Sequence, residues 1–165
     1  MKKYIKSLLF LLATTVVMVS CKKDEFNGLS DVRPAIPVTV SNAIDYRPEP
    51  TVSTSIAAGG AIQIILAIPA SSGRTIKEIT RIAASTTYSK VQGTTGLYNA
   101  APIPVGAITY TFNTTLAEYV VKGPGTIPTV STTVGTELAN RFYFMVTLDD
   151  GTVLIPEAVR VLVTN

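Results

Sequence analysis

The sequence predicts an all-β fold, a sandwich of two antiparallel sheets, from three observations. Apolar and polar residues alternate from residue 51 onward with the period of two that is typical of half-buried strands. Turns rich in glycine and proline separate roughly six to eight such stretches. The segment 51–165 is also long enough to bury most of its apolar surface in one core without disulfides.

The clearest strand pair is predicted near the C-terminus, where the Asp-Gly dipeptide at 150–151 is typical of a two-residue hairpin turn. That turn pairs Leu148 with Val153. The next inward pair is Val146 with Ile155, so that apolar side chains share one face. The same parity continues along both strands, at Phe142, Phe144, Val159, Val161 and Val163.

An earlier hairpin is predicted in residues 51–68, whose second strand alternates at Ile62, Ile64, Leu66 and Ile68. The Ala-Gly-Gly sequence at 58–60 suits a three-residue turn with a glycine at positive φ. That turn places Ile56 opposite Ile62. Further strands are predicted over 107–112 and 118–121.

The segment 75–85 leaves two interpretations open. Ile76, Ile79 and Ile82 recur at a helix-like spacing, which favours a short helix. The segment is also rich in β-branched residues, which favour strands. We expect a strand.

The first twenty residues have the pattern of a secretory signal peptide. Lys2, Lys3 and Lys6 precede an apolar run of about twelve residues, shorter than the roughly 20 that span a bilayer. These three lysines also account for the net charge of +3, since 11 basic and 11 acidic residues remain from position 21 onward. A neutral mature chain offers no basic surface for nucleic acid.

The only cysteine, Cys21, ends this run in the sequence Met-Val-Ser-Cys. The pattern resembles the lipobox of bacterial lipoproteins. The resemblance implies a diacylglyceryl thioether on Cys21, cleavage just before it and acylation, such as palmitoylation, of the new amino group. Two or more chains anchor a protein stably, whereas one does not. Apart from this covalent lipid, we expect no cofactor.

The next residues resemble the start of surface lipoproteins of the Bacteroidota, in which Lys23, Asp24 and Glu25 would act as an export signal. The resemblance implies an outer-membrane lipoprotein exposed at the cell surface. The periplasmic face is the alternative. We interpret residues 21–50 as the acylated cysteine and a proline-rich, extended tether, in which residues 36–40 can add an edge strand.

The aromatic-rich strand, tight turn and valine-rich last strand resemble the final hairpin of immunoglobulin-like modules in bacterial surface lipoproteins. This resemblance implies an immunoglobulin-like sandwich over 51–165, after a signal peptide (1–20) and the tether. The chain has no Trp and no second Cys, so the usual buried tryptophan and disulfide of that fold are missing.

The composition argues against catalysis. A chain without His has no Ser-His-Asp triad and no histidine-ligated zinc. The adjacent carboxylates Asp149 and Asp150 lie in the predicted turn, where Asp favours the turn dihedrals, so we expect no metal site there. We therefore predict that the protein is not an enzyme.

Two long loops, 84–104 and 122–140, are the candidate binding regions. Tyr88, Tyr98 and Asn99 are the candidate residues, because a tyrosine ring can stack on a sugar and an amide can bond to it. The alternative is that the tyrosines pack within their own loops.

Two functions remain. The first is a non-catalytic accessory module that binds a glycan or an outer-membrane partner protein in nutrient capture. The second is a structural or adhesive spacer without a small ligand, which includes assembly into filaments by donation of residues 36–40. Ile65, opposite the inward face of its strand, is the residue to inspect for an apolar contact patch.

Overall fold

β-strands dominate the described part of the chain, as the sequence predicts. The computed structural model describes residues 34–123, 125–131 and 134–165, and Pro34–Asn165 forms one compact unit. The predicted signal peptide, Cys21 and the export residues lie outside the described residues. The strands are β1 (Thr39–Val40), β2 (Thr51–Ser55), β3 (Ala61–Ala67), β4 (Ile76–Ser85), β5 (Ile103–Ala107), β6 (Thr109–Thr115), β7 (Thr136–Glu137), β8 (Arg141–Leu148), β9 (Val153–Leu154) and β10 (Arg160–Thr164). The helices are the 3-10 turn η1 (Ala70–Ser72), α2 (Ser89–Gln92) and α3 (Leu116–Lys122).

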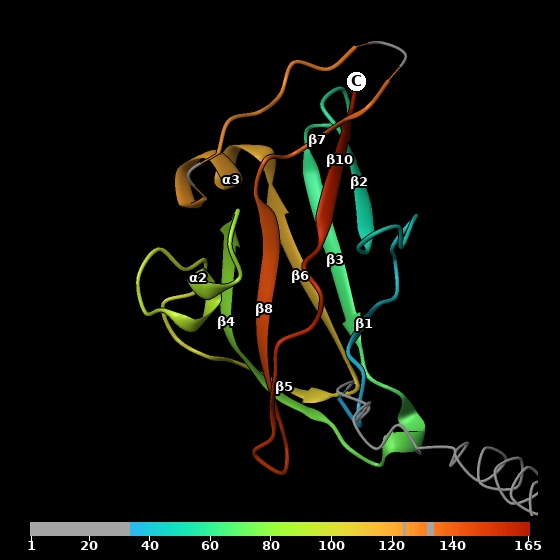
Figure 1. Cartoon of the computed structure of the whole chain (residues 1–165), viewed down its shortest axis with the longest axis vertical. Coiled ribbons are helices and arrows are strands. Elements are labelled where there is room, and N and C mark those ends of the chain that lie inside the picture. Colours follow the sequence, from blue (N-terminus) through green and yellow to red (C-terminus); the bar gives the residue numbers. More distant parts are fainter. Residues whose placement is uncertain (1–33, 124, 132–133) are drawn as a thin grey trace, which may run out of the picture. The chain divides into compact units, whose positions relative to one another are not determined.

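The strands form three sheets, with the orders β1-β3-β6, β2-β10-β7 and β5-β4-β8-β9 (Figure 1). Neighbours are antiparallel except β2 and β10, which run parallel. Two hydrogen bonds between Phe142 and Val159, of 2.9 and 2.8 Å, join the start of β8 to the approach to β10. This bridge links the second and third sheets.

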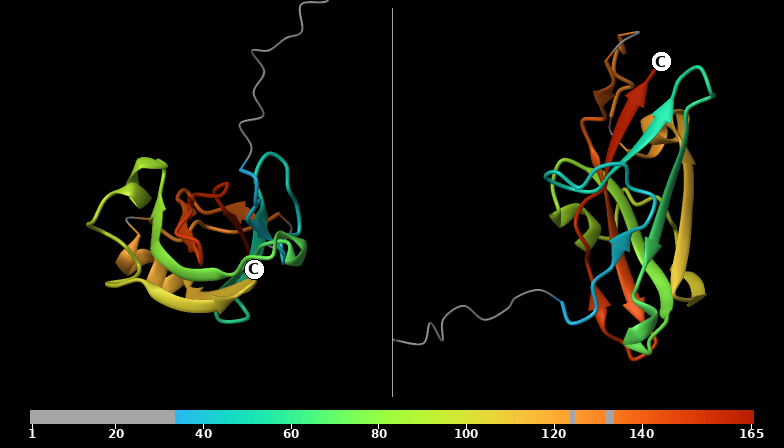
Figure 2. Two further views of the ribbon diagram at one scale, coloured as in Figure 1. Left: turned by 90° about the horizontal axis from the view of Figure 1, so that it is seen from below. Right: turned by 90° about the vertical axis from the view of Figure 1, so that its right-hand side faces the viewer.

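The strands surround a common interior (Figure 2). Buried side chains from all three sheets form one hydrophobic core there. Aromatic rings lie near its centre, and the Phe112 and Phe144 rings meet edge-on with centroids 5.6 Å apart. β3, β8 and β10 contribute the alternate residues that the period of two predicts. The largest fully buried side chains on the strands include Ile62, Ile64, Leu66, Ile76, Ile79, Ile82, Phe142, Phe144 and Leu148.

The expectation of a strand at 75–85 is confirmed by β4, and the helix-like spacing of its isoleucines has a structural cause. The pairing of β4 shifts register between Ile76 and Glu78, and again between Ile79 and Arg81. Each bulge adds one residue to the strand, so a spacing of three returns the side chain to the same face. Ile76, Ile79 and Ile82 are therefore all buried.

The predicted hairpin between residues 51–56 and 62–68 is wrong, although the alternation within β3 is confirmed. β3 pairs with β1 and β6, whereas β2 pairs with β10 in another sheet. Gly59 and Gly60, with φ of 89° and 68°, carry the chain from one sheet to the other, because glycine reaches positive φ without a steric cost. Ile56 is consequently exposed instead of paired inward.

The C-terminal turn is present, but its predicted register is wrong by one residue. Val146 pairs with Leu154, and the Leu148 N–H donates to the Thr152 carbonyl at 2.9 Å. The loop therefore holds three residues and ends at Gly151 with φ of 87°, the arrangement of a type I turn with a glycine bulge. Val153 is exposed as a result.

The strand predicted over 118–121 is wrong, because this segment is helix α3. Thr115 is its N-cap, and the Thr115 Oγ1 accepts a hydrogen bond from the Glu118 N–H at 3.1 Å. The sequence Thr-x-x-Glu is the signature of such a cap. The strand predicted over 107–112 corresponds in part to β6.

The described part of the predicted tether, residues 34–50, belongs to the compact unit. Val40 is buried in the core, and β1 adds to the edge of β3, in part of the predicted 36–40 strand. Asn42 extends this pairing, donating from Nδ2 to the Gln63 carbonyl and accepting from the Ile65 N–H, both at 2.9 Å. None of the helices among the described residues has the length and apolar character needed to span a bilayer.

Candidate functional site

Tyr98, a predicted binding residue, is part of the core. Its side chain is only 7% exposed and contacts the Phe112 and Phe142 rings edge-on, at 5.7 and 5.5 Å between centroids. Burial is the main cause that raises the pKa of Tyr98, and the nearby Glu118 carboxylate adds to it. Lys122 covers this ring from α3, with Nζ 5.5 Å from the centroid and 3.2 Å from the Tyr98 carbonyl oxygen. The ring is thus not available to stack on a sugar.

Asn99, the second predicted binding residue, fastens its loop to β4. Its Oδ1 accepts a hydrogen bond from the Ile82 N–H at 2.8 Å. Its Nδ2 donates to the carbonyls of Thr80 and Ala101, at 3.1 and 2.9 Å. The amide therefore replaces a stretch of strand pairing along β4, and its polar atoms are used by the fold.

Tyr88, the third predicted binding residue, is 50% exposed at the N-terminal end of α2. Its hydroxyl accepts a hydrogen bond from Gln92 Nε2 at 2.8 Å. The helix packs through the buried Val91 against Ala83 and Tyr143, in a small cluster on the outer side of the sheet. Of the three candidates, Tyr88 alone presents its ring to solvent.

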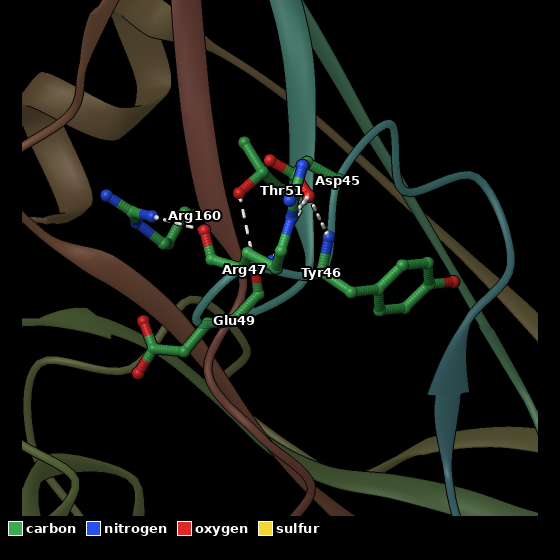
Figure 3. A network of polar contacts seen from close by, with 6 residues as sticks. All are labelled: Asp45, Tyr46, Arg47, Glu49, Thr51 and Arg160. Carbon is green, nitrogen blue, oxygen red and sulfur yellow. Dashed lines mark hydrogen bonds and ion pairs between the residues drawn. The ribbon is translucent and has the colours of Figure 1, made fainter.

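A network of polar contacts that the sequence analysis did not anticipate surrounds residues 45–51 (Figure 3). Asp45 Oδ1 accepts hydrogen bonds from the Tyr46 and Arg47 N–H groups at 2.7 and 3.2 Å. The Tyr46 N–H is the main cause that lowers the pKa of Asp45. Arg160 Nη1 approaches the Arg47 carbonyl at 3.5 Å, which ties this segment to β10. The dense charge and proline pattern of DYRPEP, residues 45–50, is the only sequence signal for it.

The charges of this region are paired with one another. Arg141 Nε lies 2.7 Å from Glu49 Oε2, and Arg160 pairs with Glu137. Arg47 Nε lies 3.4 Å from Asp45 Oδ1. The three arginines and three carboxylates balance, so the network fastens the N-terminal segment to the sheet and leaves no net charge to attract an ion.

The carboxylates of the C-terminal turn act as the sequence predicts for turn residues. Asp150 Oδ1 accepts a hydrogen bond from the Thr152 N–H at 2.9 Å, the main cause that lowers the pKa of Asp150. Arg74 lies 3.8 Å from Asp149 and 3.2 Å from Asp150. Among the described residues, no group of three or more His, Cys, Asp or Glu side chains is arranged to hold a metal ion.

Helix α3 and the described residues that follow it in the sequence include several exposed apolar side chains. Val121 is 84% exposed, and Val120, Ile127 and Val134 are also exposed. Ile65, the residue singled out for an apolar patch, is only half-buried, and its backbone is covered by Ser41 and Asn42 beside β1.

No family model, curated protein or solved structure matches this chain.

Proposed function

We propose that the chain is a lipid-anchored, non-catalytic binding module of the outer membrane that contacts a partner protein at the cell surface. The observation that carries this proposal is the lone cysteine at the end of an apolar signal-like segment. Acylation requires a thiol at this position and needs no second cysteine, so it accounts for a single cysteine there. The compact unit beginning at Pro34 is then the part that the lipid presents.

The same proposal includes an immunoglobulin-like sandwich. Parallel pairing of the early strand β2 with the last strand β10 supports it, as do the order β5-β4-β8 and the link from β8 to β10. A rigid sandwich of this kind holds loops and strand edges in fixed positions for recognition.

A partner protein is favoured over a glycan because the fold itself uses two of the three candidate sugar-binding residues. Tyr98 is buried and Asn99 is fully engaged with β4, which leaves Tyr88 as a single exposed ring. The exposed Val120 and Val121 of α3 suit a protein contact better than a polar sugar.

The anchor is tested by Cys21→Ser in the full chain. We expect the wild-type protein in the membrane fraction with a mass increase corresponding to acyl chains, and the variant in the soluble fraction. A variant that remains membrane-bound, or a native protein with a free thiol, would contradict the proposal. Replacing Lys23, Asp24 and Glu25 by alanine, followed by protease treatment of intact cells, separates the surface from the periplasmic face.

The partner is tested by cross-linking on intact cells, followed by mass spectrometry. Recovery of one outer-membrane protein with the wild type, and its loss with Val121→Glu, supports the proposal. A polysaccharide array is the second arm, and retention that depends on Tyr88, measured with Tyr88→Ala, would contradict it in favour of a glycan. Recovery of no partner and no glycan would favour the structural spacer.

A further inference from the structure

β6 is an edge strand with an unusual lack of protection. In the part of the chain that the structure describes, it ends the sheet β1-β3-β6 and has β3 as its one strand neighbour. It lies at the margin of the molecule in the right-hand view of Figure 2. Its seven residues, Thr109–Thr115, include no proline, no glycine and no charged residue. Native proteins usually protect an edge of this length with one of these devices.

The outward backbone groups of β6 can be assigned from its pairing. The Ile68 N–H donates to the Ile108 carbonyl at 3.0 Å, and the Leu116 N–H to the Gly60 carbonyl at 2.9 Å. In an antiparallel pair these bonds fall on every second residue, so the even-numbered residues of β6 face β3. The N–H and C=O groups of Thr111 and Asn113 therefore point away from the sheet.

The other sheet edges among the described residues are blunted. β1, β7 and β9 are two residues long, and β5 contains Pro104 and a glycine at positive φ. β2 has five residues, but its outer side is occupied at both ends. The Thr51 N–H and carbonyl bond to the segment 44–45, and the Ser55 carbonyl accepts from the Gly60 N–H.

We propose that β6 pairs with β6 of a second copy of this chain, antiparallel and about a two-fold axis near Phe112. In this register Thr111 lies opposite Asn113 of the second copy, and each such pair exchanges two backbone hydrogen bonds. The two sheets then continue into one sheet of six strands. This isologous contact closes after two copies.

The absence of charged residues on and near β6 favours a second copy of the chain as the pairing partner. No charged residue occurs from Val91 to Ala117, which includes β5, β6 and the turn between them. The outward side chains of the neighbouring strand, such as Gln63, are uncharged as well. Two copies therefore meet without like-charge repulsion, and Thr and Asn side chains suit cross-strand contacts. Confinement to a membrane raises the local concentration, which a contact of this small size requires.

Disulfide trapping in intact membranes tests the register. The double variant Thr111→Cys with Asn113→Cys places each new thiol opposite a thiol of the second copy, within the distance that a disulfide spans. We expect a covalent dimer on a non-reducing gel after mild oxidation. Thr111→Cys alone should give at least several-fold less dimer. In this register position 111 of the second copy lies diagonally across from position 111 of the first copy and not directly opposite it.

The matched control is Ala61→Cys with Gln63→Cys, which has the same spacing and the same outer face on β3. It should give no dimer. Equal dimer from the control, or no dimer from the β6 double variant while circular dichroism shows a native spectrum, would overturn the proposal. The design rests on the proposed function, because an acylated Cys21 has no free thiol that could cross-link. A covalent dimer of the wild-type chain would show that Cys21 is not acylated, and would contradict the proposed anchor without bearing on the β6 pairing.

Charge variants give an independent readout of association by native mass spectrometry from mild detergent. Thr111→Lys with Asn113→Lys sets like charges opposite each other and should reduce the dimer at least about twofold, since two such pairs form across the axis. Thr111→Glu with Asn113→Lys sets opposite charges together and should restore it. Equal dimer from both variants, or dimer lost equally in both, would overturn the pairing.

Discussion

At the scale of single residues, position 125 requires glycine because Tyr119 leaves no space there for a side chain. A Cβ at this position would overlap the Tyr119 hydroxyl, which also accepts a hydrogen bond from the Asn140 N–H at 3.0 Å. We expect Gly125→Ala to displace the ring and cost about 1–3 kcal/mol of the free energy of unfolding. Urea unfolding followed by circular dichroism measures this loss.

Gly93→Ala is the matched control for that substitution. Its Cβ would lie 3.4 Å from the Lys90 carbonyl, and the backbone of Gly93 is in a conformation that alanine adopts. A shift in the midpoint as large in Gly93→Ala as in Gly125→Ala would contradict the role given to the Tyr119 contact.

For the candidate binding residues, the sequence did not indicate which side chains are buried and which are exposed. Tyr98 and Asn99 sit in a loop without periodicity, so no alternation indicated which of them faces the core. Burial of Tyr98 depends on Phe112 and Phe142, which are far away in the sequence, and the bonds of Asn99 depend on β4. Tyr98 packs against the rings of β6 and β8 in the shared core and not within its own loop, whereas Tyr88 remains exposed.

At the scale of elements, local patterns predicted the strands better than their partners. Alternation identified β3 and β8, because burial on one face acts residue by residue. β4 was harder, since its two bulges change the period from two to three and mimic a helix. The register of the C-terminal turn was missed by one residue because Asp-Gly suits both a two-residue and a three-residue loop.

Helix α3 contains an ion pair whose contribution to the free energy of unfolding should depend on pH. Glu118 bonds to Lys122 Nζ at 2.6 Å and accepts a hydrogen bond from Thr114 Oγ1 at 2.7 Å. These contacts, the one with Lys122 first, lower the pKa of Glu118 below its ordinary value of 4.5. The stabilisation is therefore complete above pH 4.5 and is lost as the pH falls through the lower, folded-state pKa.

The contribution is expected to be modest, from a few tenths to about 1 kcal/mol, because the pair is partly exposed to solvent. Urea midpoints measured from pH 7 down to pH 3 should fall more steeply for the wild type than for Glu118→Gln. Glu157→Gln, which removes an exposed carboxylate elsewhere, should keep the wild-type slope. Identical slopes for the wild type and Glu118→Gln would contradict the assignment.

At the scale of the whole molecule, the order of strands was beyond the sequence. Sequential pairing is the usual expectation, and it predicted β2 beside β3. The chain instead crosses between sheets at Gly59 and Gly60, and β2 meets β10 at the far end of the sequence. The alternating valines of β10 indicate which face of the strand is buried but not which strand lies beside it. The observed pairing joins residues about 110 positions apart, as in Val163 with Thr54, so no local pattern indicates it.

Because the three sheets share one core, we expect them to unfold together. β3, β4 and β8 meet through side chains such as Leu66, Ile79 and Phe144, all buried in one cluster, so no sheet can lose its inward face alone. We expect one unfolding transition, in which far-ultraviolet circular dichroism and tyrosine fluorescence give the same midpoint. Leu66→Ala should lower both midpoints together, at a cost of about 2–5 kcal/mol. If the tyrosine signal, which includes the buried Tyr98 and Tyr119, shifted while the backbone signal did not, the sheets would be separate units despite their common core.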